Sequence, residues 1–351
     1  MKRLSATPEF VGGLVSIVMP TYKGAHSLGR AIESVLAQDY SPFELIVVDD
    51  NPPESDARAS TLKLMELYKG DERIRYVCHS RNLNGSAARN TGINESSGEY
   101  IAFLDDDDVL MPRRLSAGVA AMRRHPLASM FFSDILHVYD DKGHMNLYVM
   151  NESDLTPAGI LLNEAAIGTG SNLFCRRLLV LSIDGFDPRF QRHQDLEFSI
   201  RMLMAAPEVV VSHESLVVKG FNGVSNVPSY DKLGSVKELY NNVFDKIIRE
   251  LKTDDANAYW RNLHISLYRS ALRSNDFSAA RMHLEQAVKY GWSRGLKETL
   301  QLTLARLGIF KILVKDGKAA TISNGTNAEV DHIVEYEYYQ RMGELAACRG
   351  R

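Results

Sequence analysis

The chain has 351 residues, of which 45% are hydrophobic and 24% charged, and its formal net charge is -3. This length fits two domains, or one large α/β domain with a helical appendage, and the composition is that of an ordinary soluble globular protein. The small negative charge argues against wholesale nucleic-acid binding.

Strand-like and helix-like patterns alternate through the N-terminal part of the chain, which favours a parallel sheet flanked by helices. Apolar runs predict strands, and apolar residues at helical spacing predict helices. In chain order the sequence predicts a strand at 15–19 ended by Pro20, a helix around 28–36, a strand at 44–48, a helix around 61–68, a strand at 74–78, a helix at 85–93, a strand starting at Tyr100, a helix around 115–122 and a strand at 130–135.

The pattern is mixed from residue 139 to Pro228, which is typical of the substrate side of an α/β enzyme. After Pro228 the sequence predicts helices: one apolar stripe over 233–247, and a pair joined by the turn at 274–276. A further amphipathic helix is expected at 296–315, a linker at 316–330, and a short helix or a frayed tail at 331–347.

Three cysteines are widely spaced, without the paired spacing of a zinc site, which indicates a reducing compartment. The first 13 residues lack the apolar core of a signal peptide, and no stretch reaches the apolar length of a membrane-spanning helix. We therefore expect a cytoplasmic protein. A peripheral contact with the inner face of the cell membrane stays open.

Four consecutive carboxylates, Asp105 to Asp108, follow the apolar run Tyr100–Leu104. That run predicts a buried strand, so the acids lie where it leaves the sheet. Adjacent like charges repel, and this is tolerable where a cation is held or where a surface turn dilutes the repulsion. Oxygen-rich clusters suit Mg²⁺ or Mn²⁺, and the alternative is a solvated turn before the helix that Pro112 opens.

Polar residues also follow the first two predicted strands. Pro20-Thr21-Tyr22 comes after the first, and Asp49-Asp50-Asn51 comes after the second. In an open parallel sheet, ligands bind beyond the carboxyl ends of the strands. Three strand ends therefore bring groups that can contact a ligand to one rim of the sheet.

The chain resembles the family 2 glycosyltransferases of the GT-A fold over about residues 15–218, through five motifs that are specific when taken together. In order they are Ser16–Tyr22, Leu45–Asp50, Asn84–Gly92, Phe103–Asp108, and Gly185–Phe190 followed by Gln194–Arg201. The resemblance implies a Rossmann-like, mostly parallel α/β sheet with a C-terminal helical extension. Together with the helical pattern after Pro228, it predicts a nucleotide-sugar-binding and catalytic domain at 1–228, a helical extension at 229–315, and a linker and tail at 316–351.

The resemblance also implies an inverting, hexosyltransferase-type enzyme. It would move a sugar from a nucleotide diphosphate, most simply a UDP-sugar, to a hydroxyl of a saccharide or lipid-linked acceptor in cell-surface polysaccharide or glycan biosynthesis. Mn²⁺ or Mg²⁺ would assist, with Asp107 touching the metal and Asp105 lying towards the ribose and the metal's water shell. The expected nucleotide-sugar contacts are Pro20, Thr21, Tyr22, Asp50, Arg89, Asp105 and Asp106.

Several of these residues also have plainer explanations. By resemblance, Asp50 accepts from the ring N–H of uracil or thymine, Tyr22 stacks on the base, and Arg89 contacts the diphosphate or the base. The alternatives are a helix cap and turn for Asp49-Asp50 and a surface salt bridge for Arg89. Within the acid run, Asp106 and Asp108 also fit as spacing, turn or supporting residues.

Asp195 is the expected catalytic base. An acceptor hydroxyl needs a carboxylate within hydrogen-bond reach to take its proton. The family places this acid in a Glu-Asp pair at a helix start, and here Gln194 replaces the glutamate. A helix-capping role is the alternative for Asp195.

Two other functions are weighed against the transferase. A phosphotransferase of the haloacid dehalogenase type also carries Asp-x-Asp after a strand, with the first acid, here Asp105, as nucleophile. That motif usually follows the first strand, whereas three strand and helix units precede it here. A non-catalytic nucleotide-sugar or glycan-binding protein on the same scaffold is the second alternative. A homodimer also stays open.

Overall fold

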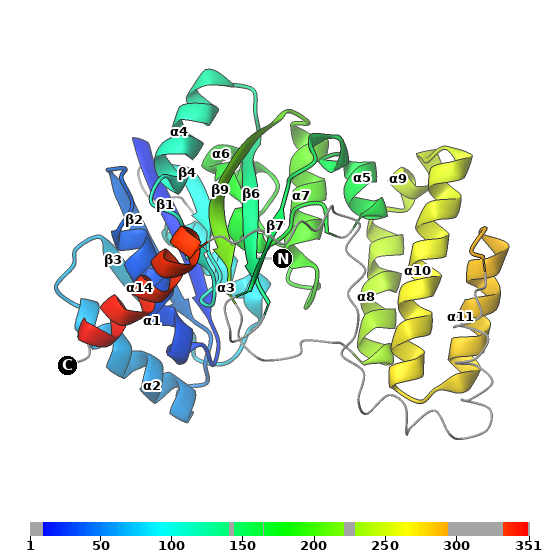
Figure 1. Cartoon of the computed structure of the whole chain (residues 1–351), viewed down its shortest axis with the longest axis horizontal. Coiled ribbons are helices and arrows are strands. Elements are labelled where there is room, and N and C mark those ends of the chain that lie inside the picture. The colour runs from blue at the N-terminus through cyan, green and yellow to red at the C-terminus, as the bar shows by residue number, and fades with distance from the viewer. Residues whose placement is uncertain (1–9, 140–143, 164, 221–228, 294–332, 350–351) are drawn as a thin grey trace. The chain divides into compact units, whose positions relative to one another are not determined.

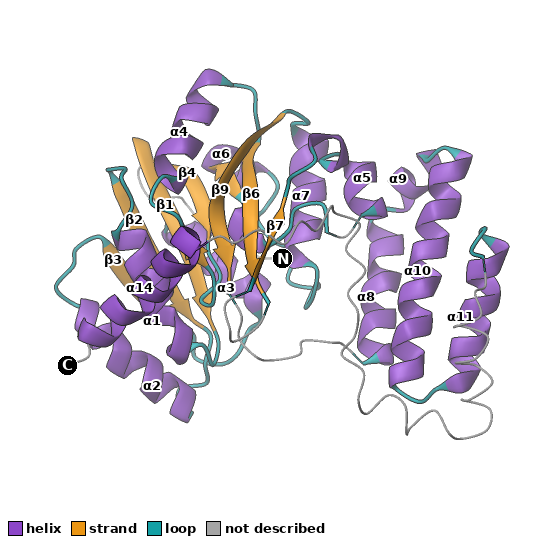
Figure 2. Ribbon diagram, viewed as in Figure 1, coloured by secondary structure: helices purple, strands orange, loops and turns teal. Residues whose placement is uncertain are grey.

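The computed structural model describes residues 10–139, 144–163, 165–220, 229–293 and 333–349. The chain divides into two compact units. Unit 1 comprises residues 1–160, 164–223 and 325–351, and unit 2 comprises residues 161–163 and 224–324. Figure 1 follows the chain by colour, and Figure 2 separates its helices from its strands.

Unit 1 opens with the alternation of strands and helices that the sequence predicts. The elements are β1 (Val11–Thr21), α1 (Ala25–Leu36), β2 (Phe43–Asp49), α2 (Asp56–Met65), β3 (Ile74–Cys78), α3 (Gly85–Glu95), β4 (Gly98–Phe103), β5 (Val109–Leu110), α4 (Arg114–Arg124) and β6 (Met130–Val138). Several boundaries differ from the prediction: β1 starts at Val11 and runs through Pro20 to Thr21, and β6 extends to Val138.

The middle of the chain supplies shorter elements. They are β7 (Met145–Tyr148), α5 (Pro157–Leu162), β8 (Phe174–Arg176), α6 (Arg177–Ser182), α7 (Gln194–Ala205) and β9 (Val209–Lys219), with single helical turns at Glu66–Tyr68, Glu152–Asp154 and Gly170–Asn172.

In the described residues these strands form one nine-stranded sheet with the order β3-β2-β1-β4-β8-β6-β9-β5, and β7 pairs with β6. The pairs β3–β2, β2–β1 and β1–β4 are parallel, while β8 runs antiparallel to β4. The chain leaves β1 towards β2 and β3 and returns to pair β4 on the other side of β1. This reversal is the position where open α/β sheets bind ligands.

The central strands are apolar on both faces because helices cover both. On one face Ile46 and Val48 pack with Ala88 of α3. Helix α3 lies close to β1 since Gly92 has no side chain: a Cβ atom there would be 2.3 Å from Val18 Cγ1. The register aligns Thr21 with Asp49, so β1 and β2 end together at one edge of the sheet.

The C-terminal segment forms a helix, α14 (Ile333–Arg349), which packs on α1 within unit 1. Tyr338 Oη donates a hydrogen bond to Leu110 O at 3.0 Å, and Met342 is 3% exposed. Arg349 Nε lies 2.6 Å from Glu33 Oε1. Of the two forms expected for the segment 331–347, a helix or a frayed tail, the structure shows the helix. The other helix, expected at 296–315, and the linker expected at 316–330 lie outside the described residues.

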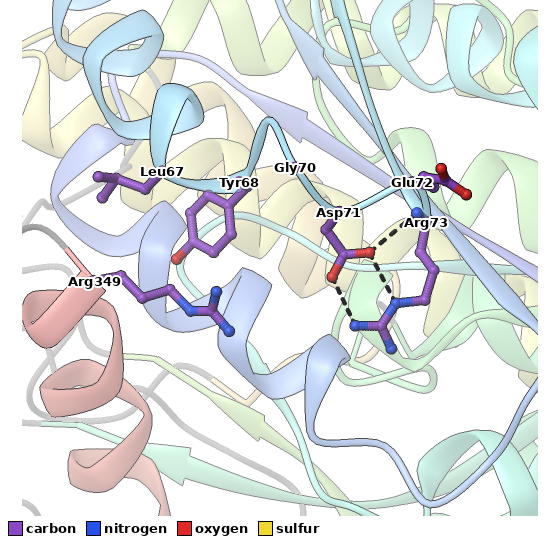
Figure 3. A pocket seen from close by; sticks show the side chains of 7 residues that line it. All are labelled: Leu67, Tyr68, Gly70, Asp71, Glu72, Arg73 and Arg349. Atoms are coloured by element: carbon purple, nitrogen blue, oxygen red, sulfur yellow. Dashed lines mark hydrogen bonds and ion pairs between the residues drawn. The ribbon is translucent and has the colours of Figure 1, made fainter.

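A surface pocket of about 490 Å³ lies beside the end of α14. Figure 3 shows the side chains that line it. The guanidinium of Arg349 lies over the ring of Tyr68, 5.4 Å from its centroid. Asp71 and Arg73, at the other end of the pocket, pair with each other. Three charged side chains at this pocket therefore already have ion-pair partners: Arg349 pairs with Glu33, and Asp71 pairs with Arg73.

Unit 2 is helical, with α8 (Tyr230–Val243), α9 (Asp245–Glu250), α10 (Thr253–Arg273) and α11 (Phe277–Lys289). The single stripe expected over 233–247 is divided, because the helix is interrupted at Phe244. The predicted helix pair is confirmed, and Asp276 caps α11 by accepting from Ala279 N at 2.9 Å. None of the helices in the described part of the chain is long and apolar enough to cross a membrane.

Two histidines face each other inside unit 2, and we expect them to make it sensitive to acid. Their Nδ1 atoms, on His264 and His283, are 3.0 Å apart, and Tyr230 Oη is 2.9 Å from His283 Nε2. Burial, with a smaller contribution from His283, lowers the pKa of His264 to about 4. The pKa of His283 is also lowered by burial, while Asp276 opposes that change.

Between the folded value for His264 and its unfolded value of about 6.5, the unfolded chain binds more protons than the folded one. The free energy of unfolding of unit 2 is then greatest above the unfolded pKa and falls as the pH drops towards the folded pKa. Urea unfolding followed by tryptophan fluorescence tests this, since both tryptophans, Trp260 and Trp292, lie in unit 2. The urea concentration at the unfolding midpoint should be lower at pH 5 than at pH 7.5. In His264→Phe the difference between the two pH values should be smaller. An equal midpoint at both pH values contradicts the prediction.

Candidate functional site

Asp49 and Asp50, at the end of β2, have different surroundings. Asp49 is fully buried and its Oδ2 lies 3.0 Å from Arg58 Nε. Its Oδ1 accepts from Asn51 N at 2.8 Å. Asp49 therefore neutralises a buried arginine and closes the turn after β2, as the turn interpretation predicts for this acid.

Asp50 is buried and organises the loop before α3. Its carboxylate is 2.7 Å from His79 Nδ1 and accepts from Asn82 Nδ2, Leu83 N and Asn84 N at 2.9, 2.8 and 3.0 Å. Asn84 has a φ of 79°, a conformation that L residues rarely adopt. The hydrogen bonds from Asp50 hold this loop in place, which is a role that the sequence did not reveal.

Asn84 also caps α3, because its side chain accepts from Ala87 N at 3.2 Å. Arg89, one turn further along α3, donates from Nη1 to Gln194 Oε1 at 2.8 Å and from Nη2 to Asp105 Oδ1. The side chain of Arg89 is 11% exposed. It is therefore a largely buried bridge between the acid run and the start of α7.

The four acids of the run occupy different environments. Asp105, Asp106 and Asp107 are partly exposed, whereas Asp108 is buried. Burial raises the pKa of Asp106 to about 7 and the pKa of Asp108 to about 7, and the charges of Asp107 and Asp105 add to both increases. Asp106 lies against the start of α1, since a Cβ atom on Gly24 would be 1.8 Å from its Oδ2.

A turn that the sequence analysis did not single out supports the run. We call it the 169–172 turn. Asp108 Oδ2 accepts from Thr169 Oγ1 at 3.0 Å and from Ser171 Oγ at 2.6 Å, while Ser171 Oγ accepts from Asp105 N at 2.9 Å. The supporting role considered for Asp108 fits these contacts. The small polar run Thr169-Gly170-Ser171-Asn172 between apolar neighbours was the available clue to a turn at the site.

Asp195 lies in the first turn of α7, at the positive end of the helix dipole. Its Oδ1 accepts from Leu196 N at 3.0 Å. Gly170 adjoins both Asp195 and Asp105, because a Cβ atom there would lie 3.7 Å from an Oδ2 atom of each. The fold thus brings together two acids that are 90 positions apart in the printed sequence.

A cleft of about 750 Å³ opens at the carboxyl ends of β1, β2 and β4. Its lining includes every residue expected to contact a nucleotide sugar or a metal: Pro20, Thr21, Tyr22, Asp50, Arg89, Asp105, Asp106 and Asp107. The predicted base, Asp195, is outside this lining and adjoins it through Gly170. Tyr22 is 48% exposed, and Lys23 Nζ lies 5.1 Å from the centroid of its ring.

The donor atoms of the cleft suit a hard divalent cation that shares its coordination with a phosphate. No group of three His, Cys, Asp or Glu side chains is arranged to hold an ion within the described ranges. Mg²⁺ in nucleotide sites binds one or two carboxylates and completes its shell with phosphate oxygens and water. Asp105 and Asp107 supply carboxylates of that kind at the cleft.

Comparison with known proteins gives a family and a set of relatives. Residues 16–178 match the family described as glycosyl transferase family 2. The chain is 34% identical over 118 residues to UDP-Glc:alpha-D-GlcNAc-diphosphoundecaprenol beta-1,3-glucosyltransferase WfgD of Escherichia coli, a match of 34% of this chain and 44% of that protein. It is 38% identical over 103 residues to the GalNAc(5)-diNAcBac-PP-undecaprenol beta-1,3-glucosyltransferase of Campylobacter jejuni, which covers 29% and 32% of the two chains.

The aligned region therefore spans less than half the length of these two relatives. Among solved structures, the chain resembles S. aureus TarS 1-349 in complex with UDP-GlcNAc, with a TM-score of 0.52 and 17% identity. That alignment covers 80% of this chain and 93% of the other. At this identity the likeness concerns the fold alone, and it agrees with the mostly parallel α/β sheet that the sequence predicts.

Proposed function

Because residues 16–178 belong to glycosyl transferase family 2, we propose that this protein transfers a sugar from a nucleotide diphosphate to a hydroxyl acceptor. The observation that carries the proposal is the cleft at the carboxyl ends of β1, β2 and β4, which gathers the aromatic, cationic and acidic side chains that such a donor requires. We further propose that the reaction inverts the anomeric centre and depends on a divalent metal.

The nucleoside would lie between Tyr22 and Asp50. An exposed tyrosine ring offers a face for stacking a base, and stacking of this kind is worth roughly 1–3 kcal/mol in nucleic-acid complexes. Asp50 already accepts hydrogen bonds from the loop before α3. A ring N–H of uracil would therefore share the carboxylate with these donors, and the ordered loop would form the wall of the base site.

The diphosphate would lie against the N-terminus of α3, which borders the cleft at Asn84 and Gly85. Helix N-termini favour anions because their first N–H groups lack intrahelical partners. Arg89 supplies a positive charge at the same wall. The residues fit Mn²⁺ or Mg²⁺ held by Asp107 and Asp105, whose bound charge would offset the negative charge that develops on the leaving diphosphate.

Asp195 would act as the base. In the proposed step, the acceptor oxygen forms a bond to the anomeric carbon while the bond from that carbon to the diphosphate oxygen breaks. The electron pair of the broken bond leaves with the nucleoside diphosphate, and the proton of the acceptor hydroxyl goes to Asp195. A single displacement of this kind inverts the anomeric carbon. Arg89 and Gln194 hold the donor side and the start of α7 together.

The named relatives from Escherichia coli and Campylobacter jejuni act on saccharides linked through diphosphate to undecaprenol. By analogy we propose a UDP-sugar as donor and a lipid-linked or polysaccharide acceptor for this chain. Contact with a membrane surface and dimerisation remain predictions.

Thermal unfolding of unit 1 with UDP and Mn²⁺ tests the donor and metal proposals. A ligand at 100 times its dissociation constant stabilises the folded state by about 2.7 kcal/mol. We expect UDP with Mn²⁺ to raise the unfolding midpoint by several degrees, on the scale of roughly 2–4 °C per kcal/mol. UDP alone should raise it less. The variant Asp107→Asn should lose the increment that Mn²⁺ adds.

The control is Asp245→Asn, an exposed acid in unit 2, which should respond as the parent does. If UDP, dTDP and GDP sugars leave the midpoint unchanged with and without Mn²⁺, the transferase proposal fails. If the donors bind but no sugar is ever transferred or hydrolysed, the non-catalytic binding protein becomes the better description.

A further inference from the structure

Gly170 lies next to both Asp105, which is proposed to bind the donor, and Asp195, which is proposed to deprotonate the acceptor. A Cβ atom there would lie 3.6 Å from Asp195 Cβ, 3.7 Å from Asp195 Oδ2 and 3.7 Å from Asp105 Oδ2. In the proposed function, Asp105 serves the donor and Asp195 serves the acceptor. The missing side chain of Gly170 therefore leaves room between the donor carboxylate and the base.

The fold itself does not require glycine at this position. The residues with a left-handed φ include Gly168 and Gly185 but not Gly170, so an L residue can adopt its backbone conformation. Contacts of 3.6 and 3.7 Å are ordinary van der Waals distances. Gly24 and Gly92 differ, since their added Cβ atoms would lie 1.8 and 2.3 Å from neighbouring side-chain atoms. Alanine thus fits at position 170 without displacing the protein.

The 169–172 turn is also fixed in place, so an added methyl group would stay where it is built. Arg114 Nη2 donates to Asn172 O at 2.7 Å, and Asn172 Oδ1 accepts from Ser133 N at 3.0 Å. Ser171 Oγ accepts from Asp105 N at 2.9 Å. Since the backbone of the turn is bonded to α4 and its side chains to β6 and to the residue after Leu104, the turn has little freedom to retract.

We infer that Gly170 keeps open the space in which the acceptor hydroxyl meets the anomeric carbon of the donor sugar. This inference rests on the proposed function and adds a residue that sets the room available to the substrates. A proton acceptor must lie about 2.6–3.2 Å from the hydroxyl that it deprotonates. The methyl group of an alanine, in contact with Asp195 and Asp105, would occupy that position. Gly170 is thus a positioning residue, and it takes no part in proton transfer.

The test compares Gly170→Ala with Gly12→Ala in the full chain. Gly12 is exposed and an added Cβ atom there meets nothing within 4 Å, so its variant controls for a generic glycine replacement. The measurements are the unfolding midpoint, the affinity for UDP with Mn²⁺, and the release of UDP from UDP-glucose. For Gly170→Ala we expect an unchanged midpoint and UDP affinity, and a fall of about 100-fold in UDP release, the scale of a misplacement by 1 Å.

Parental UDP release by Gly170→Ala overturns the inference, because the space would then be unused. A parallel loss of UDP affinity also overturns it, since the glycine would then serve the nucleotide site or the fold. Failure of the proposed function is distinguishable: in that case the parent and Gly12→Ala would neither bind UDP nor release a nucleoside diphosphate from UDP, dTDP or GDP sugars, and the inference would fall with it.

Discussion

Replacement of Asp195 by asparagine should lower the rate of sugar transfer by about a thousandfold, within the range of roughly 10²–10⁴ that general base catalysis contributes. Asparagine keeps the size and shape of the side chain but cannot take the proton of the acceptor hydroxyl. UDP affinity should be unchanged, because Asp195 is outside the lining of the cleft that holds the donor site. The measurement is UDP release from UDP-glucose with a synthetic lipid-diphosphate-linked GlcNAc as acceptor.

Glu208→Gln is the matched control for Asp195→Asn. It removes one exposed carboxylate that pairs only weakly with His125, and it should keep the parental rate. If Asp195→Asn transfers sugar at the parental rate, Asp195 is a helix cap and the base lies elsewhere. If it loses UDP affinity along with the rate, the residue supports the fold of the site and the kinetic result says nothing about proton transfer.

The residues of the proposed donor site could be predicted from the sequence because parallel strands end at a common edge of the sheet. The apolar runs of β1, β2 and β4 are unmistakable, and each is followed at once by the residues that line the cleft. Position along the chain was thus sufficient to bring Tyr22, Asp50 and Asp105 together. The family resemblance assigned roles to them, and the shared edge explains why those roles are compatible.

The different burial and contacts of the four aspartates could not be predicted from the order of the strands. All four acids are adjacent aspartates in sequence, yet Asp108 is buried against Thr169 and Ser171. These contacts join residues that are more than 60 positions apart, and local patterns carry no information about them. The role of Gly170 has the same origin, since the acids beside it come from distant segments.

Elements that depend on tertiary partners were missed or were left with two alternatives. Strand β8 has only three residues, too few for a periodic pattern, and β9 carries the polar stretch Ser212–Ser215 where its register with β6 shifts. Helix α14 was one of two forms expected for its segment, and it is stabilised by contacts within unit 1, such as the ion pair of Arg349 with Glu33. In each case the stabilising contact is long-range, so sequence periodicity underestimates the element.

The largest effect on stability is expected from Arg58→Met. Arg58 and Asp49 form an ion pair whose side chains are 7% and 0% exposed. Arg58 Nη2 also donates to the carbonyl oxygens of Asp49, Asn51 and His79. Methionine fills much of the volume but leaves the Asp49 carboxylate buried without its cation. Breaking a buried pair by removing one partner costs about 3–5 kcal/mol.

Urea unfolding followed by far-UV circular dichroism measures this cost, with Arg113→Met as the control. Arg113 pairs with Glu214 at 2.8 Å, and their side chains are 63% and 46% exposed. An exposed pair is worth about 0–1 kcal/mol, so the control should barely move the transition. Equal destabilisation by both variants would contradict the structural role of Asp49.

Arg58→Met should also weaken UDP binding. Arg58 donates a hydrogen bond to the backbone carbonyl of His79, and the imidazole ring of His79 contacts Asp50 in the proposed base site. The buried pair behind the cleft would then stabilise unit 1 and position the nucleotide site at the same time.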